Sequence, residues 1–153
     1  MNFKLKINGG LQKGQSLFEV VVAIAISALI ITAIVSLASN SIQNSSFSRD
    51  KTLAANYVQQ TNEWLRQERD KSTSNFIAKA AIPTWCFTTL SWTRSSACGA
   101  TEYISGTKFV RQSSFTISVV DGKNLVQIDT VVSWRDSKGL RQVKSSTNLS
   151  VLQ

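Results

Sequence analysis

The chain has 153 residues, enough for one domain of ordinary size, and its single proline and seven glycines exclude a low-complexity linker. The formal net charge is +8, but the basic residues after Gly14 are scattered singly, so a solvated basic surface is a simpler interpretation than nucleic-acid binding. The absence of histidine removes the commonest general base and the commonest metal ligand.

The strongest feature of the sequence is an uncharged apolar run from Val20 to Ala38, in which Ser27, Thr32 and Ser36 are the polar residues. The run is about 19 residues long, close to the roughly 20 that a helix needs to cross a bilayer. The hydroxyl groups are tolerable there because a helical serine or threonine can donate to its own backbone carbonyls. The run therefore predicts a membrane-spanning helix.

Three lysines precede the run, at positions 4, 6 and 13. The positive-inside tendency places residues 1–14 in the cytoplasm and the remainder of the chain outside. Two simple interpretations are open. A cleaved signal peptide would be cut near Ser36-Leu37-Ala38 and release a secreted soluble β protein that begins near Ser39. A plain single-span anchor would leave Gly14 and Glu19 without a role.

A third interpretation uses the stretch KGQSLFE, residues 13–19, at the start of the run. It resembles the N-terminal processing signal of type IV pilins and of the pseudopilins of type II secretion systems. The resemblance implies that a prepilin peptidase cuts after Gly14 and methylates the amino group of Gln15. Glu19 would then be the fifth mature residue, which is a glutamate in that family. Ser36 stands where major pilins often have proline, which favours a minor pilin or pseudopilin.

The resemblance also explains a carboxylate inside an apolar segment. Intramembrane carboxylates are rare and usually have a partner. The freed amine of Gln15 in a neighbouring subunit would neutralise Glu19 when helices bundle, and the pair would set their axial stagger. The alternative is that Glu19 simply reaches the membrane interface.

Further implications concern partners and location. The implied partners are other pilin or pseudopilin subunits, the prepilin peptidase, an inner-membrane assembly platform, and membrane lipid before assembly. The implied location is a single-pass inner-membrane protein that enters a periplasmic or extracellular filament.

A second pattern follows the apolar run. Ala54, Tyr57 or Val58, Thr61 and Trp64 or Leu65 recur at steps of three and four residues, which is typical of an amphipathic helix. We therefore expect one continuous helix from about Ser16 to Asp70, with a break at residues 72–74. The opposite side is expected to face solvent, and it carries Asp50, Lys51, Gln59, Gln60, Asn62, Glu63, Arg66, Gln67 and Arg69.

The C-terminal third alternates apolar and polar residues with the period of strands. We expect strands over 113–120, 124–136 and 142–151, joined by turns at Asp121-Gly122 and at Gly139, with a further strand near 84–90 and a short helix over 75–82 ended by Pro83. The expected inward residues are Phe115, Ile117 and Val119; Val126, Ile128, Thr130, Val132 and Trp134; and Val143, Ser145, Thr147, Leu149 and Val151.

The predicted fold class is therefore α+β. A long N-terminal helix, with a membrane-spanning first half and an amphipathic second half, packs on an antiparallel sheet of about three to four strands. The predicted organisation is a leader over 1–14, an assembly helix over 15–38, the second half of the helix over 39–71, and a globular headpiece over 72–153.

The chain's two cysteines are Cys86 and Cys98. A headpiece outside the cytoplasm would allow a disulfide, worth about 3 kcal/mol by the loop-entropy model. Two free thiols are the alternative, and no metal or cofactor site is indicated. Between the cysteines, Trp92 and Arg94 are candidates for an interface, although Trp92 equally suits a core.

Catalytic motifs are missing from the sequence. It has no histidine to activate a serine, no nucleotide-binding glycine cluster and no clustered carboxylates, so we do not expect an enzyme. Two functions therefore compete with release as a secreted protein. One is a structural filament subunit. The other is a filament-tip module that captures DNA, a surface or cargo through residues 84–106.

Overall fold

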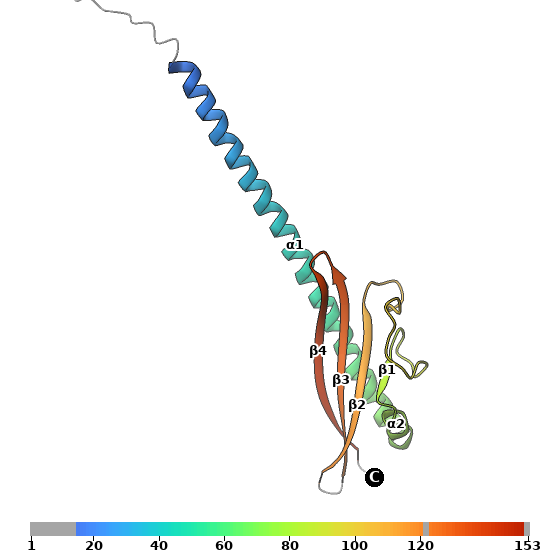
Figure 1. Ribbon diagram of the computed structural model, residues 1–153. Coiled ribbons are helices and arrows are strands. Elements are labelled where there is room, and N and C mark those ends of the chain that lie inside the picture. The colour runs from blue at the N-terminus through green and yellow to red at the C-terminus, as the bar shows by residue number, and fades with distance from the viewer. Residues whose placement is uncertain (1–14, 121–122, 152–153) are drawn as a thin grey trace, which may run out of the picture. The chain divides into compact units, whose positions relative to one another are not determined.

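The structure, a computed structural model, describes residues 15–120 and 123–151 (Figure 1). In these residues it contains α1 (Gln15–Lys71), α2 (Thr73–Ala80), β1 (Thr84–Cys86), β2 (Val110–Val120), β3 (Lys123–Asp136) and β4 (Gly139–Val151). The chain forms two compact units, Met1–Ser45 and Ser46–Gln153, and α1 runs through both. The predicted α+β class and the single long helix are confirmed.

The end of α1 is set by serine capping. The helix stops at Lys71, and Ser72 adopts an extended conformation in which its hydroxyl accepts from the backbone N–H of Asn75, as an N-cap of α2 does. The predicted break is thus confirmed at Ser72, whereas the next two residues already belong to α2. The predicted short helix is also confirmed, and it ends at Ala80, before the proline.

The four strands form one antiparallel sheet in the order β1-β2-β3-β4 (Figure 1). Strands β2 and β3 pair as far as Val120 and Lys123, and the predicted turn at Asp121-Gly122 lies outside the described residues. Strands β3 and β4 pair as far as Asp136 and Gly139, whose φ of 117° suits a residue without a side chain. The predicted strand near 84–90 is present but ends at Cys86.

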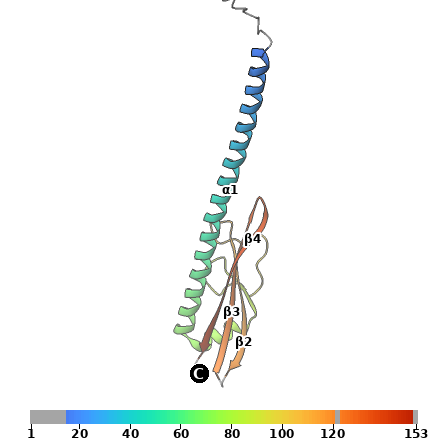
Figure 2. The same ribbon diagram turned by 90° about the vertical axis from the view of Figure 1, so that its left-hand side faces the viewer.

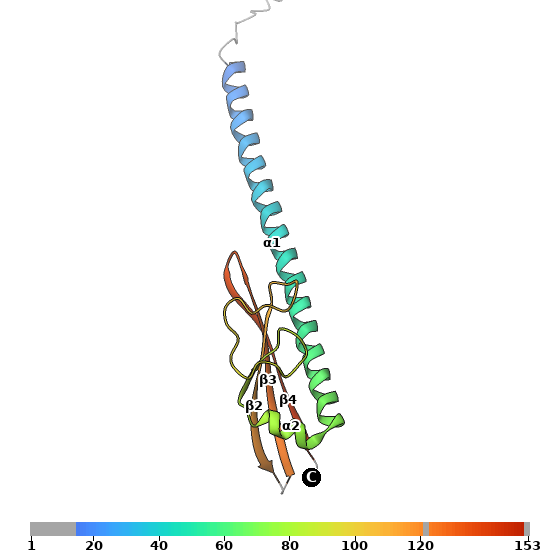
Figure 3. The same cartoon turned by 90° about the vertical axis from the view of Figure 1, so that its right-hand side faces the viewer.

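The second half of α1 lies along one face of the sheet (Figures 2 and 3). Its stripe is buried as predicted: Ala54, Thr61 and Leu65 are 0% exposed, and Val58 is 3% exposed. All five inward residues predicted for β3 are buried as well. Around them the core divides into a cluster that includes Leu65, Phe76, Phe87 and Ile128 and a cluster that includes Ala54, Val58, Val132 and Trp134.

Two residues of β2 that were predicted to face inward are exposed. Phe115 is buried, but Ile117 is 37% and Val119 is 69% exposed. The reason is the shortness of β1, which pairs only with Gln112–Ser114. Beyond Phe115, β2 pairs with β3 on one side and has no strand on the other side among the described residues. The alternation of apolar and polar residues there no longer corresponds to burial.

Two residues assigned to the solvent side of the helix are instead buried. Asp50 is 4% and Asn62 is 8% exposed. Asp50 lies one helical turn before Ala54, in line with the buried stripe, and its Oδ2 accepts from Nζ of Lys108 at 2.6 Å. Asn62 follows the buried Thr61 and faces the sheet.

A chain of side-chain hydrogen bonds joins α1 to three strands. Nδ2 of Asn62 donates to Oγ of Ser145 on β4 at 3.2 Å, and Oγ1 of Thr130 on β3 donates to Oδ1 of Asn62 at 3.0 Å. Ser113 on β2 lies 2.9 Å from the same threonine hydroxyl. Ser113 and Thr130 are fully buried, so water cannot reach their hydroxyl groups, and these bonds satisfy them instead.

Replacing the central amide should destabilise the fold. For Asn62→Ala we expect a loss of about 1–3 kcal/mol of unfolding free energy, because a buried hydroxyl loses its acceptor. The measurement is urea unfolding of the full chain in detergent micelles, followed by tryptophan fluorescence. All four tryptophans lie in the unit Ser46–Gln153. The matched control is Asn56→Ala, an exposed site on the same helix. Equal losses in both variants would contradict the role of the network.

Candidate functional site

The apolar first half of α1 is the first of two candidate regions. Every side chain from Leu17 to Arg49 is exposed, and the helix contains an 18-residue window with a mean hydropathy of 2.9. By length and composition this is one helix that can cross a membrane. As expected for hydroxyls in such a segment, Ser27 donates to the carbonyl of Ala23 at 2.7 Å and Thr32 to that of Leu29 at 2.9 Å.

Glu19 is the single acidic residue of this region, and it lies four residues after Gln15, the first residue of α1. Four residues are about one helical turn, so positions 15 and 19 share a side of the helix. Among the described residues, no cationic side chain forms an ion pair with Glu19. The predicted cleavage position, Gly14, lies outside the described residues, so the cut and the methylation of Gln15 stay predictions.

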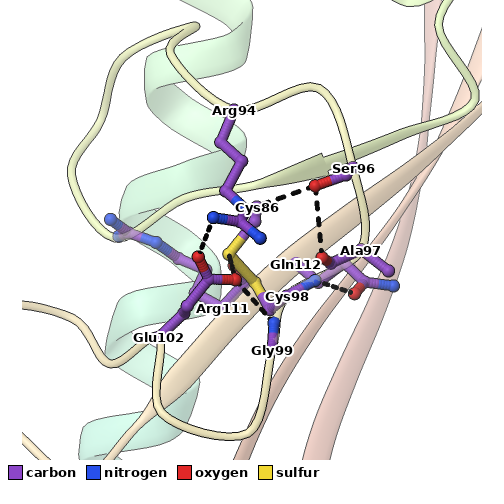
Figure 4. A network of polar contacts seen from close by, with 9 residues as sticks. All are labelled: Cys86, Arg94, Ser96, Ala97, Cys98, Gly99, Glu102, Arg111 and Gln112. Carbon is purple, nitrogen blue, oxygen red and sulfur yellow. Dashed lines mark hydrogen bonds and ion pairs between the residues drawn. A yellow bond between two sulfur atoms is a disulfide. The ribbon is translucent and has the colours of Figure 1, made fainter.

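The second candidate region is the loop that follows β1, which a disulfide closes (Figure 4). Cys86 in β1 and Cys98 in the loop are bonded to each other, with their Cα atoms 4.9 Å apart. The disulfide alternative is therefore confirmed and the alternative of two free thiols is wrong. Glu102 lies beside the sulfur atoms, but sulfurs bonded to each other are not the thiolates that bind metal ions.

Arg94 is engaged within this loop (Figure 4). Its guanidinium pairs with Glu102, and its Nε donates to Oγ of Ser96 at 3.2 Å. Glu102 also accepts from the backbone N–H of Gly99, and the backbone N–H of Cys98 donates to Oε1 of Gln112 on β2 at 3.0 Å. Half of the Arg94 side chain is still exposed, but its charge already has a partner.

Trp92 packs as a core residue. Its ring lies among aromatic neighbours at centroid distances between 5.0 and 6.2 Å, namely Trp64, Phe76, Trp85, Phe87 and Phe115. Its Nε1 donates to Oε2 of Glu68 on α1 at 3.0 Å. The core alternative accounts for these contacts, and an interface role for Trp92 and Arg94 stays a prediction.

The pKa of Glu68, whose carboxylate accepts the hydrogen bond from Trp92, lies below its ordinary value. The ammonium of Lys71 donates to Oε1 of Glu68 at 2.8 Å and lowers the pKa of Glu68. Partial burial opposes this effect, whereas the Trp92 hydrogen bond reinforces it. The bond from Trp92 to α1 therefore has a charged acceptor at neutral pH.

A buried guanidinium lies beneath the disulfide loop. Arg111 of β2 is 3% exposed, and its Nε donates to the carbonyl of Phe87 at 3.0 Å. Burial lowers the pKa of Arg111 to about 10, so the group is still cationic at neutral pH. Its backbone carbonyl accepts from the N–H of Phe87, which fixes the segment after β1 against β2.

Some of these residues escaped the sequence analysis. Asp50 had a usable signal, since it precedes Ala54 by one turn and so continues the buried stripe. Glu102 and Lys108 had none, because both lie in an irregular loop without periodicity, where Glu102 pairs with Arg94 of the same loop and Lys108 pairs with Asp50 on α1. Arg111 lies two positions before Ser113, so alternation carries a signal for an inward position, but the predicted strand began only at residue 113 whereas β2 begins at Val110.

Comparison with known proteins gives one positive finding. Residues 10–35 match the family model described as the prokaryotic N-terminal methylation motif. The matched segment contains Gly14, Gln15 and Glu19 and most of the apolar run. No curated protein and no solved structure is significantly similar to the chain.

Removing the disulfide should destabilise the loop and its attachment to β2. For the double variant Cys86→Ala, Cys98→Ala we expect a loss of about 3 kcal/mol of unfolding free energy, because the unfolded chain gains the entropy of an open loop. Urea unfolding of the full chain in micelles measures it. Wild-type protein unfolded in the presence of a reductant should give the same value. A loss below about 1 kcal/mol in both experiments would contradict a stabilising role.

Proposed function

Because residues 10–35 carry the methylation motif that is the prepilin signal of type IV pilin-like proteins, we propose that the chain is a structural filament subunit, of the minor pilin or pseudopilin kind. The observation that carries the proposal is the spacing of three sequence features. The glycine, the glutamate five positions later and the uncharged run fall in one matched segment. A type IV pilus and a type II secretion filament are both machines in which such a subunit serves.

The first step of the proposed mechanism is processing. A prepilin peptidase removes residues 1–14 on the cytoplasmic side and methylates the amino group of Gln15. The lysines of the leader favour this orientation, since they stay inside while the following helix crosses the membrane. The disulfide supports the same orientation for the headpiece, because disulfides persist outside the cytoplasm.

The second step is storage in the membrane. An exposed, uncharged helix of this length is stable in hydrocarbon, where all of its backbone hydrogen bonds lie within the segment. The subunit therefore waits as a single-pass inner-membrane protein, and the assembly platform of that membrane extracts it. In the filament the apolar faces of sister helices replace the lipid.

The third step is pairing of Glu19 with the amine of a neighbouring Gln15. A carboxylate that leaves the bilayer edge for the centre of a helical bundle needs a cation there, because an unpaired buried charge is strongly destabilising. The lack of a cationic partner among the described residues favours a partner from another subunit. Pairing at one position along a smooth apolar helix also selects one axial stagger.

Filament-tip capture of DNA, a surface or cargo is the competing proposal. The contacts of the loop favour it less, because Arg94 is paired with Glu102 and Trp92 lies in an aromatic cluster. DNA retardation by the full chain in micelles, with Arg94→Ala for comparison, distinguishes the two. Retardation that depends on Arg94, together with normal filaments in the variant, would favour capture.

Cleavage is tested by the mass of the mature chain. We expect a chain that begins at Gln15 with a methylated amine. Gly14→Leu should leave an uncut chain that begins at Met1, because the peptidase acts at the glycine. Gly9→Leu is the control, since it makes the same change in the leader outside the matched segment. A wild-type chain that begins near Ser39 would instead support an ordinary signal peptide.

Assembly is tested by a neutral isostere of Glu19. Glu19→Gln should be cut and methylated normally but lower the filament yield about tenfold or more, the factor for about 1.4 kcal/mol of lost pairing per subunit. Immunoblotting of sheared surface fractions measures the yield. Glu63→Gln is the control, since it removes an exposed carboxylate from the same helix. A normal filament yield from Glu19→Gln would instead support the alternative that Glu19 simply reaches the membrane interface.

A further inference from the structure

We propose that a cavity at the end of β3 receives an extended acidic peptide segment of a partner protein, which adds a short strand to the open edge of β3. The inference concerns the unit Ser46–Gln153 and does not depend on processing or on filament assembly. It rests on four observations: the cavity itself, an unpaired stretch of strand, an unsatisfied buried donor and an unpaired charge.

The cavity has a volume of about 380 Å³. One wall is the loop that contains Gly99, Ala100 and Tyr103, and the other is formed by the start of β2 and the end of the β3–β4 hairpin, including Arg135 and Leu140. A volume of this size accommodates a few residues of extended chain.

The cavity lies where β2 would continue if it were longer. Strand β2 begins at Val110, opposite Ser133, whereas β4 goes on pairing with β3 as far as Asp136. Residues Trp134–Asp136 of β3 therefore have a neighbouring strand on one side and none on the other, within the described part of the chain. A sheet edge of this kind can accept an added strand.

The alternation of the ladder shows which residue presents its backbone to this edge. The backbone N–H of Phe87, just after β1, donates to the carbonyl of Arg111 on β2, and the N–H of Phe115 on β2 donates to the carbonyl of Pro83, just before β1. The odd-numbered residues of β2 therefore present their backbone groups to the β1 side. The even-numbered residues, such as Val110, then face the odd-numbered residues of β3. Arg135 follows Ser133 by two positions and presents its N–H and C=O to the open side.

Trp134, one of the residues that line the same cavity, carries a buried donor without an acceptor. Trp134 is 2% exposed, and its Nε1–H is the buried side-chain polar group that has no hydrogen-bond partner among the described residues. Such groups are rare in folded proteins because each costs free energy. The atom itself is buried from solvent, so the Trp134 side chain has to shift before an acceptor on an incoming peptide satisfies it.

The charge of the cavity defines the occupant. Arg135 is exposed at the rim and forms none of the ion pairs of the described residues, whereas Lys108 on the opposite wall is already paired with Asp50. A carboxylate beside Arg135 would form a charge-assisted bond. Tyr103 and Leu140 are 45% and 67% exposed and suit apolar side chains on either side of the carboxylate. The matching chemistry is an extended segment in which an acidic residue lies between β-branched residues.

The test uses the full chain in micelles with its four tryptophans labelled with 15N. The probe is the peptide acetyl-TVEVT-amide, and the readout is the indole N–H signal of Trp134, assigned by its loss in Trp134→Phe. We expect a saturable shift of this signal. The peptide acetyl-TVQVT-amide should bind about tenfold or more weakly, because it lacks the charge. No saturable shift, or equal affinity for the two peptides, would overturn the proposal.

Two variants separate charge from strand addition. Arg135→Glu should weaken binding about tenfold or more, and Lys138→Glu, an exposed cation of the same hairpin outside the cavity, should not. Arg135→Pro removes the N–H on the open edge without removing a hydrogen bond of the sheet. The free energy of unfolding should therefore stay unchanged, whereas binding of the peptide should be lost. A shift of equal size with free glutamate, or unchanged binding in Arg135→Pro, would exclude recognition of an extended backbone.

Discussion

The apolar first half of α1, whose side chains no other described residue covers, is the feature on which the rest of the molecule depends. Every side chain from Leu17 to Arg49 is exposed, and large apolar residues occur on all sides of the helix. Each buried methylene is worth about 0.8 kcal/mol, so water is a poor environment for this segment. Lipid is one environment that suits it, and under the proposed function the helices of neighbouring subunits are another. In that proposal Glu19 makes the exchange selective, because lipid tails supply no cation whereas a neighbour's amine does.

The change of surroundings along α1 is abrupt. Asp50 is the first buried residue of the helix, and from there a stripe of small and apolar residues packs on the sheet. No glycine or proline interrupts the helix at this point. The second half of the same helix supplies core residues such as Val58 and Leu65. The core of the unit Ser46–Gln153 is therefore incomplete without α1.

Much of this architecture could be read from the sequence, because periodicity records burial directly. The course of α1 followed from the apolar run and the amphipathic stripe, its end from the break at residues 72–74, the inward face of β3 from alternation, and the turn at Gly139 from its glycine. Periodicity failed where burial depends on distant neighbours. Ile117 and Val119 alternate correctly, yet β1 is too short to help cover them. Asp50 and Asn62 are polar, yet Lys108 and Thr130, remote in sequence, provide the partners that make their burial possible. The cavity beside Arg135 arises from unequal strand lengths, which no local pattern encodes.

The packing of α1 on the sheet within the unit Ser46–Gln153 also has a mechanical consequence. A force along the axis of this part of the helix acts on its contacts with the sheet as shear. The bond from Thr130 to Asn62, the pair of Lys108 with Asp50 and the packing around Leu65 are then loaded together, not one after another. Withdrawal of the helix along its axis therefore requires these contacts to break together, which takes more force than breaking them one at a time.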